Sequence, residues 1–356
     1  MKHRLNIHRQ APAFEIVHTG DLHTGACRFA YDYLKRHAAV FKGILEYVRA
    51  RLHAGKNVIV VIAGDLLDRK TITEDERNIA LRFVVSLVKL KVHVVVINGN
   101  HDFYNEDGVT MIHPLHIMQS LCPKYLHVVT TNPDVVNIKE LDVSFVCIPC
   151  QQDLTTKKLL GLVTAQLPKA SCSRRYGVVH EAINGSIASD NHVMKTGCDL
   201  PDIGLDGILL GDIHKAQRIG KSAWYCGSPL QVKSNEDPYK GFLLWKSGVE
   251  DPELVILKNV PRIITVTSEK QLRKYENTKH TVKYVGKKRV ESEAVNVSIQ
   301  RNLKSMVQKM NKKIADKVLD VTNNVTDGLE DWLKHKGADP DDIEEALGIV
   351  ENELTK

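Results

Sequence analysis

The sequence predicts an α/β protein, because short β-rich apolar runs alternate with helical patterns over the first 250 residues. The chain has 356 residues, 43% hydrophobic and 26% charged, as is typical of a folded protein with a substantial core. This composition argues against a disordered chain. At about 150 residues per domain, the length predicts two domains, or one large domain with an appendage.

Six apolar runs of strand length form the predicted sheet framework. They are residues 15–18, 57–63, 93–98, 143–148, 177–180 and 207–210. Between the first two runs, apolar residues from Leu34 to Leu52 recur near the helical period and predict a helix that ends around Gly55. Thr73 and Glu76 have the spacing of a capping box, which predicts the start of the next helix.

The character of the chain changes after about residue 250. Residues 262–300 carry short polar and β-branched runs with a basic stretch, and residues 301–319 predict an amphipathic helix. A Gly/Pro-containing break at 337–340 precedes a last acidic helix. We therefore expect one large domain over residues 1–250, a small domain over 251–300 and C-terminal helices over 301–356.

No apolar run approaches the roughly 18 residues of a membrane span, and no apolar region follows the charged start as in a secretory signal. We therefore expect a cytoplasmic protein whose seven cysteines are reduced thiols. Cys147 and Cys150 have the spacing of a redox motif, but they end an apolar run, which favours buried structural cysteines. The formal net charge of +6 is compatible with a polyanionic partner without requiring one.

Polar side chains follow five of the apolar runs, at the point where each strand ends. They are Asp21 and His23; Asp65 and Asp68; Asn100, His101 and Asp102; His180; and Asp212 and His214. Ligands bind at the carboxyl ends of strands in open α/β sheets, so we expect these groups to converge. Carboxylates, an amide oxygen and imidazoles suit Mn²⁺, Fe²⁺ or Zn²⁺, and this many groups would supply two ions about 3.5–4 Å apart.

Single members of this series would be unremarkable, because Asp and His are common in turns after strands. The ordered series of five is much harder to explain as turns alone. A glycine also precedes a candidate ligand at Gly20, Gly64, Gly99 and Gly211, where it would allow a sharp turn and close backbone approach.

The order of these motifs (DxH, GDxxD, GNHD, a histidine after a strand, and GxxH) resembles the calcineurin-like metallophosphoesterase superfamily. Within it, GDIHKAQ at 211–217, WYCGSPL at 224–230 and KGF at 240–242 are similar to segments of the SbcD and meiotic-recombination-eleven type of nuclease subunit. Recognisable motifs span residues 18–245. The resemblance implies an α/β sandwich of two β-sheets flanked by helices, with a small α+β capping domain and C-terminal helices.

The resemblance also implies a role for each polar group. The metal ligands would be Asp21, His23 and His214 for the first ion, Asp65 as the bridge, and Asn100, His180 and Asp212 for the second ion. His101 would protonate or stabilise the leaving oxygen, and Asp68 or Asp102 could orient it. The family usually has histidine at position 212, and the aspartate here would shift the metal preference toward Mn²⁺ or Mg²⁺.

The function implied by the resemblance is Mn²⁺-dependent DNA hydrolysis in an SbcCD-like repair and recombination complex. Its activities would be 3′-to-5′ exonuclease action on duplex ends and endonuclease action on single strands. The cofactors would be two divalent ions, with Mn²⁺ as the first choice and Mg²⁺ or Fe²⁺ as alternatives. The implied partners are DNA, an SbcC-like SMC-family ATPase bound by the C-terminal helices, and a second copy of the chain.

The candidate DNA-binding residues are the basic side chains after the first domain. They are Arg262, Lys283, Lys287, Lys288 and Arg289. An ordinary solvated basic surface explains them equally well.

Two other functions remain open. A metallophosphatase or small phosphodiesterase is suggested by GDLLDR at 64–69, although those enzymes usually carry GNHE where this chain has GNHD. A catalytically weak scaffold for the ATPase is suggested by Asp212, although His101 and the other ligand positions are intact.

Overall fold

The computed structural model describes most of the chain up to residue 299. The residues outside the description are 1–11, 31, 103–112, 152, 190, 196, 201–202, 286–289, 291, 300–332 and all later ones except Leu333, Lys334, Pro340, Ile343 and Glu344. The chain divides into two compact units, the first comprising 1–264 with 277–281 and the second 265–276 with 282–356. The functional domain boundaries expected at 250 and 300 stay predictions.

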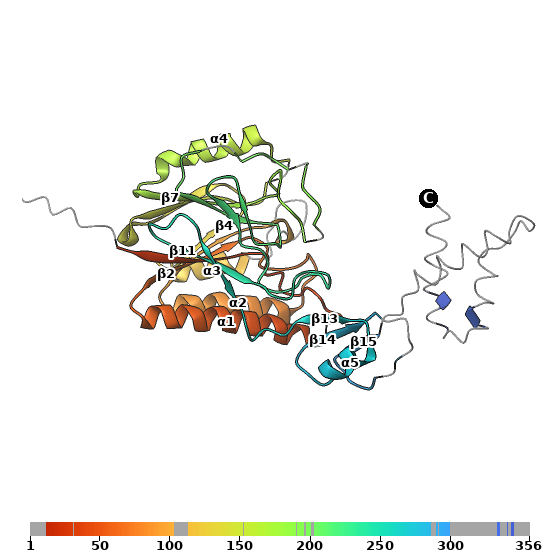
Figure 1. The fold of residues 1–356 in the computed structure, drawn as a ribbon. Helices are drawn as coiled ribbons and strands as arrows, with labels where there is room; N and C mark the ends of the chain where they lie inside the picture. Colours follow the sequence, from red (N-terminus) through yellow and green to blue (C-terminus); the bar gives the residue numbers. More distant parts are fainter. Residues whose placement is uncertain are drawn as a thin grey trace, which may run out of the picture. The chain divides into compact units, whose positions relative to one another are not determined.

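Two six-stranded sheets form the framework of the first unit (Figure 1). In spatial order, the first sheet contains β12 (Glu253–Ile256), β11 (Gly241–Lys246), β1 (Phe14–Thr19), β2 (Asn57–Ala63), β3 (His93–Ile97) and β4 (Leu126–Val129). The second contains β5 (Asp134–Ile138), β6 (Val143–Ile148), β7 (Arg174–His180), β8 (Gly207–Gly211), β10 (Ala223–Tyr225) and β9 (Gln217–Ile219). The predicted α/β sandwich with two sheets is therefore confirmed.

Parallel pairing brings the important strand ends together. Strands β1, β2, β3 and β4 are parallel neighbours, and so are β6, β7, β8 and β10. The carboxyl ends of each set therefore lie at one edge of its sheet, and the loops that follow them can share one site.

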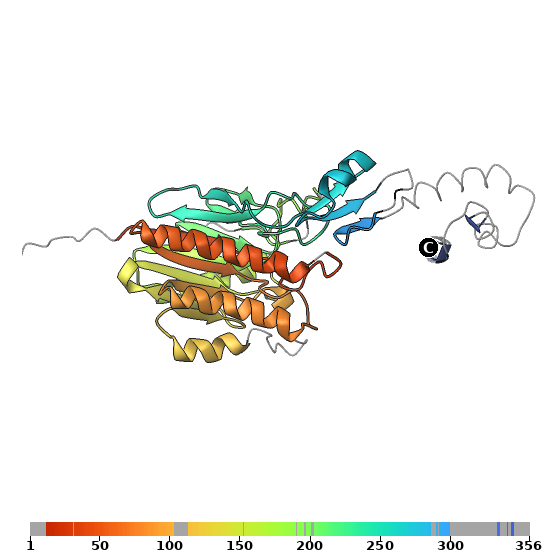
Figure 2. The ribbon, with the colours of Figure 1, turned by 90° about the horizontal axis from the view of Figure 1, so that it is seen from below.

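Helices cover the outer face of each sheet. Helices α1 (Tyr33–His53) and α2 (Glu74–Lys89) lie side by side against the first sheet (Figure 2), and α4 (Thr156–Gln166) packs on the second. Helix α3 (His113–Leu121) lies beside β4. The capping box predicted at the start of α2 is present, because the Thr73 side chain accepts from the Glu76 N–H and the Glu76 side chain accepts from the Thr73 N–H.

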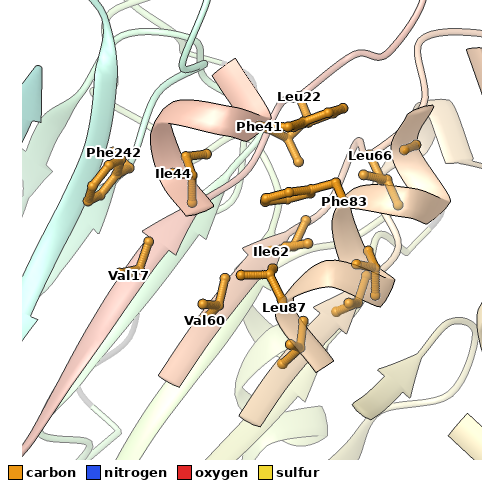
Figure 3. Packing of buried hydrophobic residues seen from close by; sticks show 14 of the residues in the cluster. Val17, Leu22, Phe41, Ile44, Val60, Ile62, Leu66, Phe83, Leu87 and Phe242 are labelled. Atoms are coloured by element: carbon orange, nitrogen blue, oxygen red, sulfur yellow. The ribbon is translucent and has the colours of Figure 1, made fainter. Parts of the chain in front are cut away.

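The central strands of the first sheet, β11, β1, β2 and β3, are buried on both faces, and alternate residues serve different cores. Val17 of β1 packs against the helices, whereas Ile16 packs between the two sheets. On the helix side, the rings of Phe41 and Phe83 stack with centroids 4.4 Å apart (Figure 3). Burying each large apolar side chain contributes about 1.5–3 kcal/mol, so these layers hold the strand ends in fixed positions.

All six predicted runs form strands, and six further strands complete the two sheets. Strands β9 and β10 have only three residues each, too few to display a period. Strands β4, β5 and β12 are four or five residues long, and each includes an exposed or half-buried position. Strand β11, GFLLWK, is almost wholly buried and continues the KGF motif.

A third, three-stranded sheet follows, in the order β13 (Ile263–Val266), β14 (Thr281–Tyr284) and β15 (Val297–Ile299). Helix α5 (Glu269–Tyr275) belongs to the second unit and starts at Ser268, whose side chain accepts from the Gln271 N–H. The helix predicted over 301–319 lies outside the described residues, as does most of the last acidic helix. Among the residues described, no helix has the length and apolar character needed to cross a membrane.

Candidate metal centre

The loops after β1, β2, β3, β7 and β8 bring most of the predicted ligands into contact. Three groups have potential ligand atoms that all lie within 4.8 Å of one another. The groups are Asp21, His23 and His214; Asp21, Asp65 and His180; and His23, Asp68 and His101. The first two groups share Asp21, so they form one continuous cluster of carboxylates and imidazoles, all buried except half-buried His214.

Asp65 lies at the centre of this cluster. Its Oδ2 is 3.4 Å from His23 Nε2 and 3.5 Å from His180 Nε2. Its other oxygen, Oδ1, accepts a hydrogen bond from the His101 backbone N–H at 2.9 Å. One carboxylate oxygen therefore faces both histidines, which is the position a bridging ligand requires.

His23 and His214 face each other through their Nε2 atoms, which are 3.0 Å apart. The Nδ1 of His214 donates to Glu236 Oε1 at 2.9 Å, so its Nε2 presents a lone pair toward His23. Asp21 is fully buried beside them. Its Oδ1 accepts from the Asp212 N–H at 3.0 Å, whereas its Oδ2 has no hydrogen-bond partner among the described residues.

His180 is oriented in the same way on the other side of Asp65. Its Nδ1 donates to the Ala63 carbonyl at 2.8 Å, which directs Nε2 into the cluster. That Nε2 is 3.0 Å from Asn100 Oδ1 and 3.8 Å from Asp212 Oδ1. Asn100 and Asp212 thus lie beside His180, as the sequence predicts, although Asp212 is the more distant of the two.

Two glycines make this packing sterically feasible. A Cβ at Gly64, whose φ is +89°, would lie 2.1 Å from His180 Nδ1. A Cβ at Gly99 would lie 2.0 Å from Asp65 Oδ1. These are the close backbone approaches that the sequence predicts at the strand ends.

The electrostatics of the cluster suit a cation. Burial by itself would lower the pKa of His23, but Asp65, Asp68 and Asp21 outweigh it and raise that pKa to about 9. The same competition, again led by Asp65, holds the pKa of His180 well above its ordinary value. The unpartnered Asp21 oxygen and the mixed oxygen and nitrogen donors fit divalent metal ions, which would replace the protons that this negative environment retains.

His101 is exposed at the edge of the cluster, with its ring centroid 4.7 Å from that of His23. Its Nδ1 is hydrogen-bonded to the backbone carbonyl of Asp68. The Asp68 carboxylate lies 3.4 Å from His23 Nδ1, and the Asp102 carboxylate accepts from the N–H groups of Leu66, Leu67 and Gly99. The hydrogen bond of His101 Nδ1 is therefore with the Asp68 main chain and not with the carboxylate of Asp68 or Asp102.

Glu236 is a site residue that the sequence analysis did not identify. Its side chain is only 1% exposed and accepts from His214 Nδ1, from Lys240 Nζ at 2.9 Å and from the Val232 N–H at 3.1 Å. Burial would raise the pKa of Glu236, but the bond from His214 and the charge of Lys240 lower it to about 2. Glu236 lies 22 residues after His214 in a loop without strand or helix periodicity, so only its presence between GSPL and KGF marks it.

The predicted DNA-binding residues are only partly described. Arg262 belongs to the first unit, where its guanidinium lies 4.3 Å from the centre of the Tyr239 ring. Lys283 lies on β14 in the second unit. Lys287, Lys288 and Arg289 lie outside the described residues.

The cysteines are all free thiols. Cys147 is buried in β6, and burial raises the pKa of the partly exposed Cys150 to about 11. Both features agree with the structural role favoured from the sequence, because a reactive thiol needs a lowered pKa.

Comparison with known proteins gives two results. The model of the calcineurin-like phosphoesterase family matches residues 14–166, a range that contains β1, β2, β3 and the candidate ligands Asp21 through Asn100. The chain is also 26% identical over 254 residues to SbcD, a subunit of the SbcCD nuclease, from Escherichia coli strain K12, and equally to SbcD from strain O157:H7. Each alignment covers 62% of this chain and 62% of the relative, so the chain matches less than two thirds of these relatives' length.

Proposed function

Because this chain belongs to the calcineurin-like metallophosphoesterases, we propose that it hydrolyses phosphodiester bonds in DNA as the nuclease subunit of an SbcCD-like complex. The observation that carries the proposal is the position of Asp65 between His23 and His180, where its carboxylate would join two ligand groups into one dinuclear site. We propose 3′-to-5′ exonuclease action on duplex ends and endonuclease action on single strands.

The proposed ligands follow the two halves of the cluster. Asp21, His23 and His214 would hold one ion, Asp65 would bridge, and Asn100, His180 and Asp212 would hold the other. Bound there, two divalent ions, Mn²⁺ or alternatively Mg²⁺ or Fe²⁺, would supply hydroxide near neutral pH and neutralise the phosphate oxygens. The extra carboxylate of Asp212 favours the harder ions at the second position.

His101 is the proposed proton donor to the leaving oxygen. It is exposed beside the cluster, and its bond to the Asp68 carbonyl fixes Nδ1 and leaves Nε2 to face the substrate. Because the contact is with the main chain, loss of the Asp68 carboxylate would leave this orientation of His101 in place. The Asp68 carboxylate would instead orient His23.

The proposed DNA substrate rests on the SbcD-like motifs and on the surface next to the cluster. A cavity of about 260 Å³ opens beside Asp212 and His214, and Lys233 and Asn235 line it. A lysine and an amide next to the ligands are suitable for holding a phosphate of the backbone. Arg262, Lys283, Lys287, Lys288 and Arg289 are proposed to add sequence-independent phosphate contacts.

The proposed protein partners are an SbcC-like ATPase and a second copy of this chain. The proposed location is the cytoplasm near the nucleoid, or the cytoplasm of a host cell if the protein is viral. The relatives are named as one subunit of a nuclease. The apolar stripe of residues 301–319, which includes Met306 and Met310, is the proposed ATPase-docking surface. Deleting 301–356 should abolish co-purification with the ATPase while the protein still hydrolyses a small phosphodiester; loss of that hydrolysis would place the stripe in the chain's own core.

The function is tested by incubating the metal-loaded protein with end-labelled duplex DNA, a single-stranded oligonucleotide, bis(4-nitrophenyl) phosphate and 4-nitrophenyl phosphate. Mn²⁺-dependent cleavage of both DNAs and of the diester, lost in the Asp65→Asn variant, is expected. Cleavage of the monoester or of small diesters without DNA cleavage would favour the metallophosphatase or small-phosphodiesterase alternative. Metal binding without turnover of any substrate would favour the scaffold alternative.

A further inference from the structure

A second cavity is also lined by His214. It encloses about 370 Å³, and its lining includes Asn191, Lys215 and Tyr239. The lining of this cavity and that of the cavity beside Asp212 share Ser189, His214 and Asn235. The two hollows therefore adjoin along these three residues, and together they lead from the edge of the metal centre to Tyr239.

Tyr239 lines this cavity and is 60% exposed, which is high for a large aromatic residue. The guanidinium of Arg262 lies 4.3 Å from the ring centroid, which holds the ring in place by a cation–π contact. Since a ring that packs on one side and is still 60% exposed must keep much of its surface free, Tyr239 offers an open aromatic face at the cavity.

Charged groups of both signs line the two hollows, and two of them are exposed lysines. Exposed Lys215 donates to Asn191 Oδ1 at 3.1 Å, and exposed Lys233 lines the adjoining hollow. The acids are Asp237, which is exposed, Asp212, which is half-buried in the adjoining hollow, and Glu236, which is buried and already paired with Lys240. Lys215 and Lys233 are placed to contact a phosphate, and the open face of Tyr239 is placed to contact a flat ring, so a ligand that has both parts suits these neighbours.

From these observations we infer that the cavity binds an unpaired nucleotide of the DNA strand being cut, with its base stacked on Tyr239. This inference rests on the proposed nuclease function and identifies the part of the substrate that the surface next to His214 recognises. A volume of about 370 Å³ is at the small end of ligand pockets, which suits one nucleotide. Stacking on an aromatic ring accepts any base, as a nuclease without sequence preference needs. Arg262 then holds the ring, in addition to the phosphate contacts proposed for it.

The test measures binding of the full-length protein, loaded with Ca²⁺ to prevent cleavage, to two fluorescent oligonucleotides of equal length. One is single-stranded oligo-dT, and the other has abasic sites throughout. Base stacking contributes about 1–3 kcal/mol, so Tyr239→Ala should weaken oligo-dT binding about 5- to 150-fold. Binding of the abasic oligonucleotide should stay within about twofold, since it depends on phosphate contacts. Tyr239→Phe, which keeps the ring, should retain the oligo-dT affinity.

Phe29→Ala is the matched control, because Phe29 is 64% exposed and does not line this cavity. It should leave both affinities and diester hydrolysis unchanged. Equal oligo-dT binding by Tyr239→Ala and the unmodified protein, or equal losses for both oligonucleotides, would overturn the inference while leaving the nuclease proposal intact. If the unmodified protein hydrolyses neither DNA nor the diester, the proposed function itself fails.

Discussion

Two regions of the first unit that enclose histidines show opposite electrostatic results. At the metal centre, carboxylates raise the pKa of His23 to about 9. In the first sheet, His93 of β3 and His127 of β4 stack with centroids 5.6 Å apart, and burial together with His93 lowers the pKa of His127 to about 4. Burial alone makes a histidine neutral, whereas burial beside several carboxylates makes it a cation, or a ligand once a metal replaces the proton.

In each region a glutamate contacts one of the histidines, and the two glutamates differ in how far they are exposed to water. Glu140 lies 3.1 Å from His93 Nε2 and is 50% exposed, whereas Glu236 lies 2.9 Å from His214 Nδ1 and is 1% exposed. An exposed pair of this kind contributes little, because water and salt screen it. A buried carboxylate on a metal-binding histidine instead fixes its tautomer and its direction.

The largest expected effect is that of Asp65→Asn, which removes the central carboxylate. Metal affinity should fall by more than about 100-fold, since even the outer partners of ligands contribute 10- to 100-fold. The pKa values of His23 and His180 should also fall in the metal-free protein, while those of His93 and His127 stay the same. Histidine titrations by NMR and calorimetry with Mn²⁺ measure both effects; unchanged titration of His23 would contradict this account of the cluster.

His101→Ala should separate catalysis from metal binding. If His101 serves the leaving group, kcat should fall by about 10²–10⁴-fold, the usual contribution of a general acid. Mn²⁺ stoichiometry should be unchanged, because His101 lies exposed at the edge of the cluster. Elemental analysis of the purified variant checks this, and full loss of metal would make His101 a ligand instead.

Glu236→Gln should weaken Mn²⁺ binding by about 10- to 100-fold while the fold is retained. Glutamine keeps the shape of the side chain but accepts the proton of His214 less strongly. Glu140→Gln is the matched control, since it changes the other glutamate that contacts a histidine. Calorimetric titration of both variants should show a loss only in the first; equal affinities would mean that Glu236 supports the loop without positioning His214.

The smallest effect concerns stability in acid. Because the folded-state pKa of His127 lies near 4, below the ordinary 6.5, the folded form binds fewer protons between these values. The contribution of His127 to stability is complete above about pH 6.5 and is lost as the pH falls toward 4. His127→Gln should reduce the acid-induced loss by about 1–2 kcal/mol, since water at this half-buried ring screens part of the full shift; urea unfolding of the metal-free protein at about pH 7 and about pH 4.5 measures it. If the free energy of unfolding falls equally in the unmodified protein and in His127→Gln, His127 does not titrate in this range.

The sequence predicts the parts of this site that follow a strand directly. Asp21, Asp65 and His180 each come at or just after the end of an apolar run, so parallel pairing places Asp21 and Asp65 at one edge of the first sheet and His180 at the corresponding edge of the second. The contact between these two edges, where His180 meets Ala63 and Asp65, depends on how the sheets pack and is not given by the pairing. Glu236 and Tyr239 lie in an irregular loop between β10 and β11, where no period locates a side chain. Their positions depend on contacts with His214 and Arg262, which the chain order does not reveal.

The geometry at Gly99 has a consequence for judging related sequences. Its backbone lies so close to Asp65 that a single methyl group would meet Asp65 Oδ1 at 2.0 Å and the Asp65 nitrogen at 2.5 Å. A homologue could therefore retain all seven candidate ligands and still misplace the Asp65 carboxylate through alanine at this one position. A glycine that touches no ion is thus as good a criterion for an intact centre as any of the acidic or imidazole side chains.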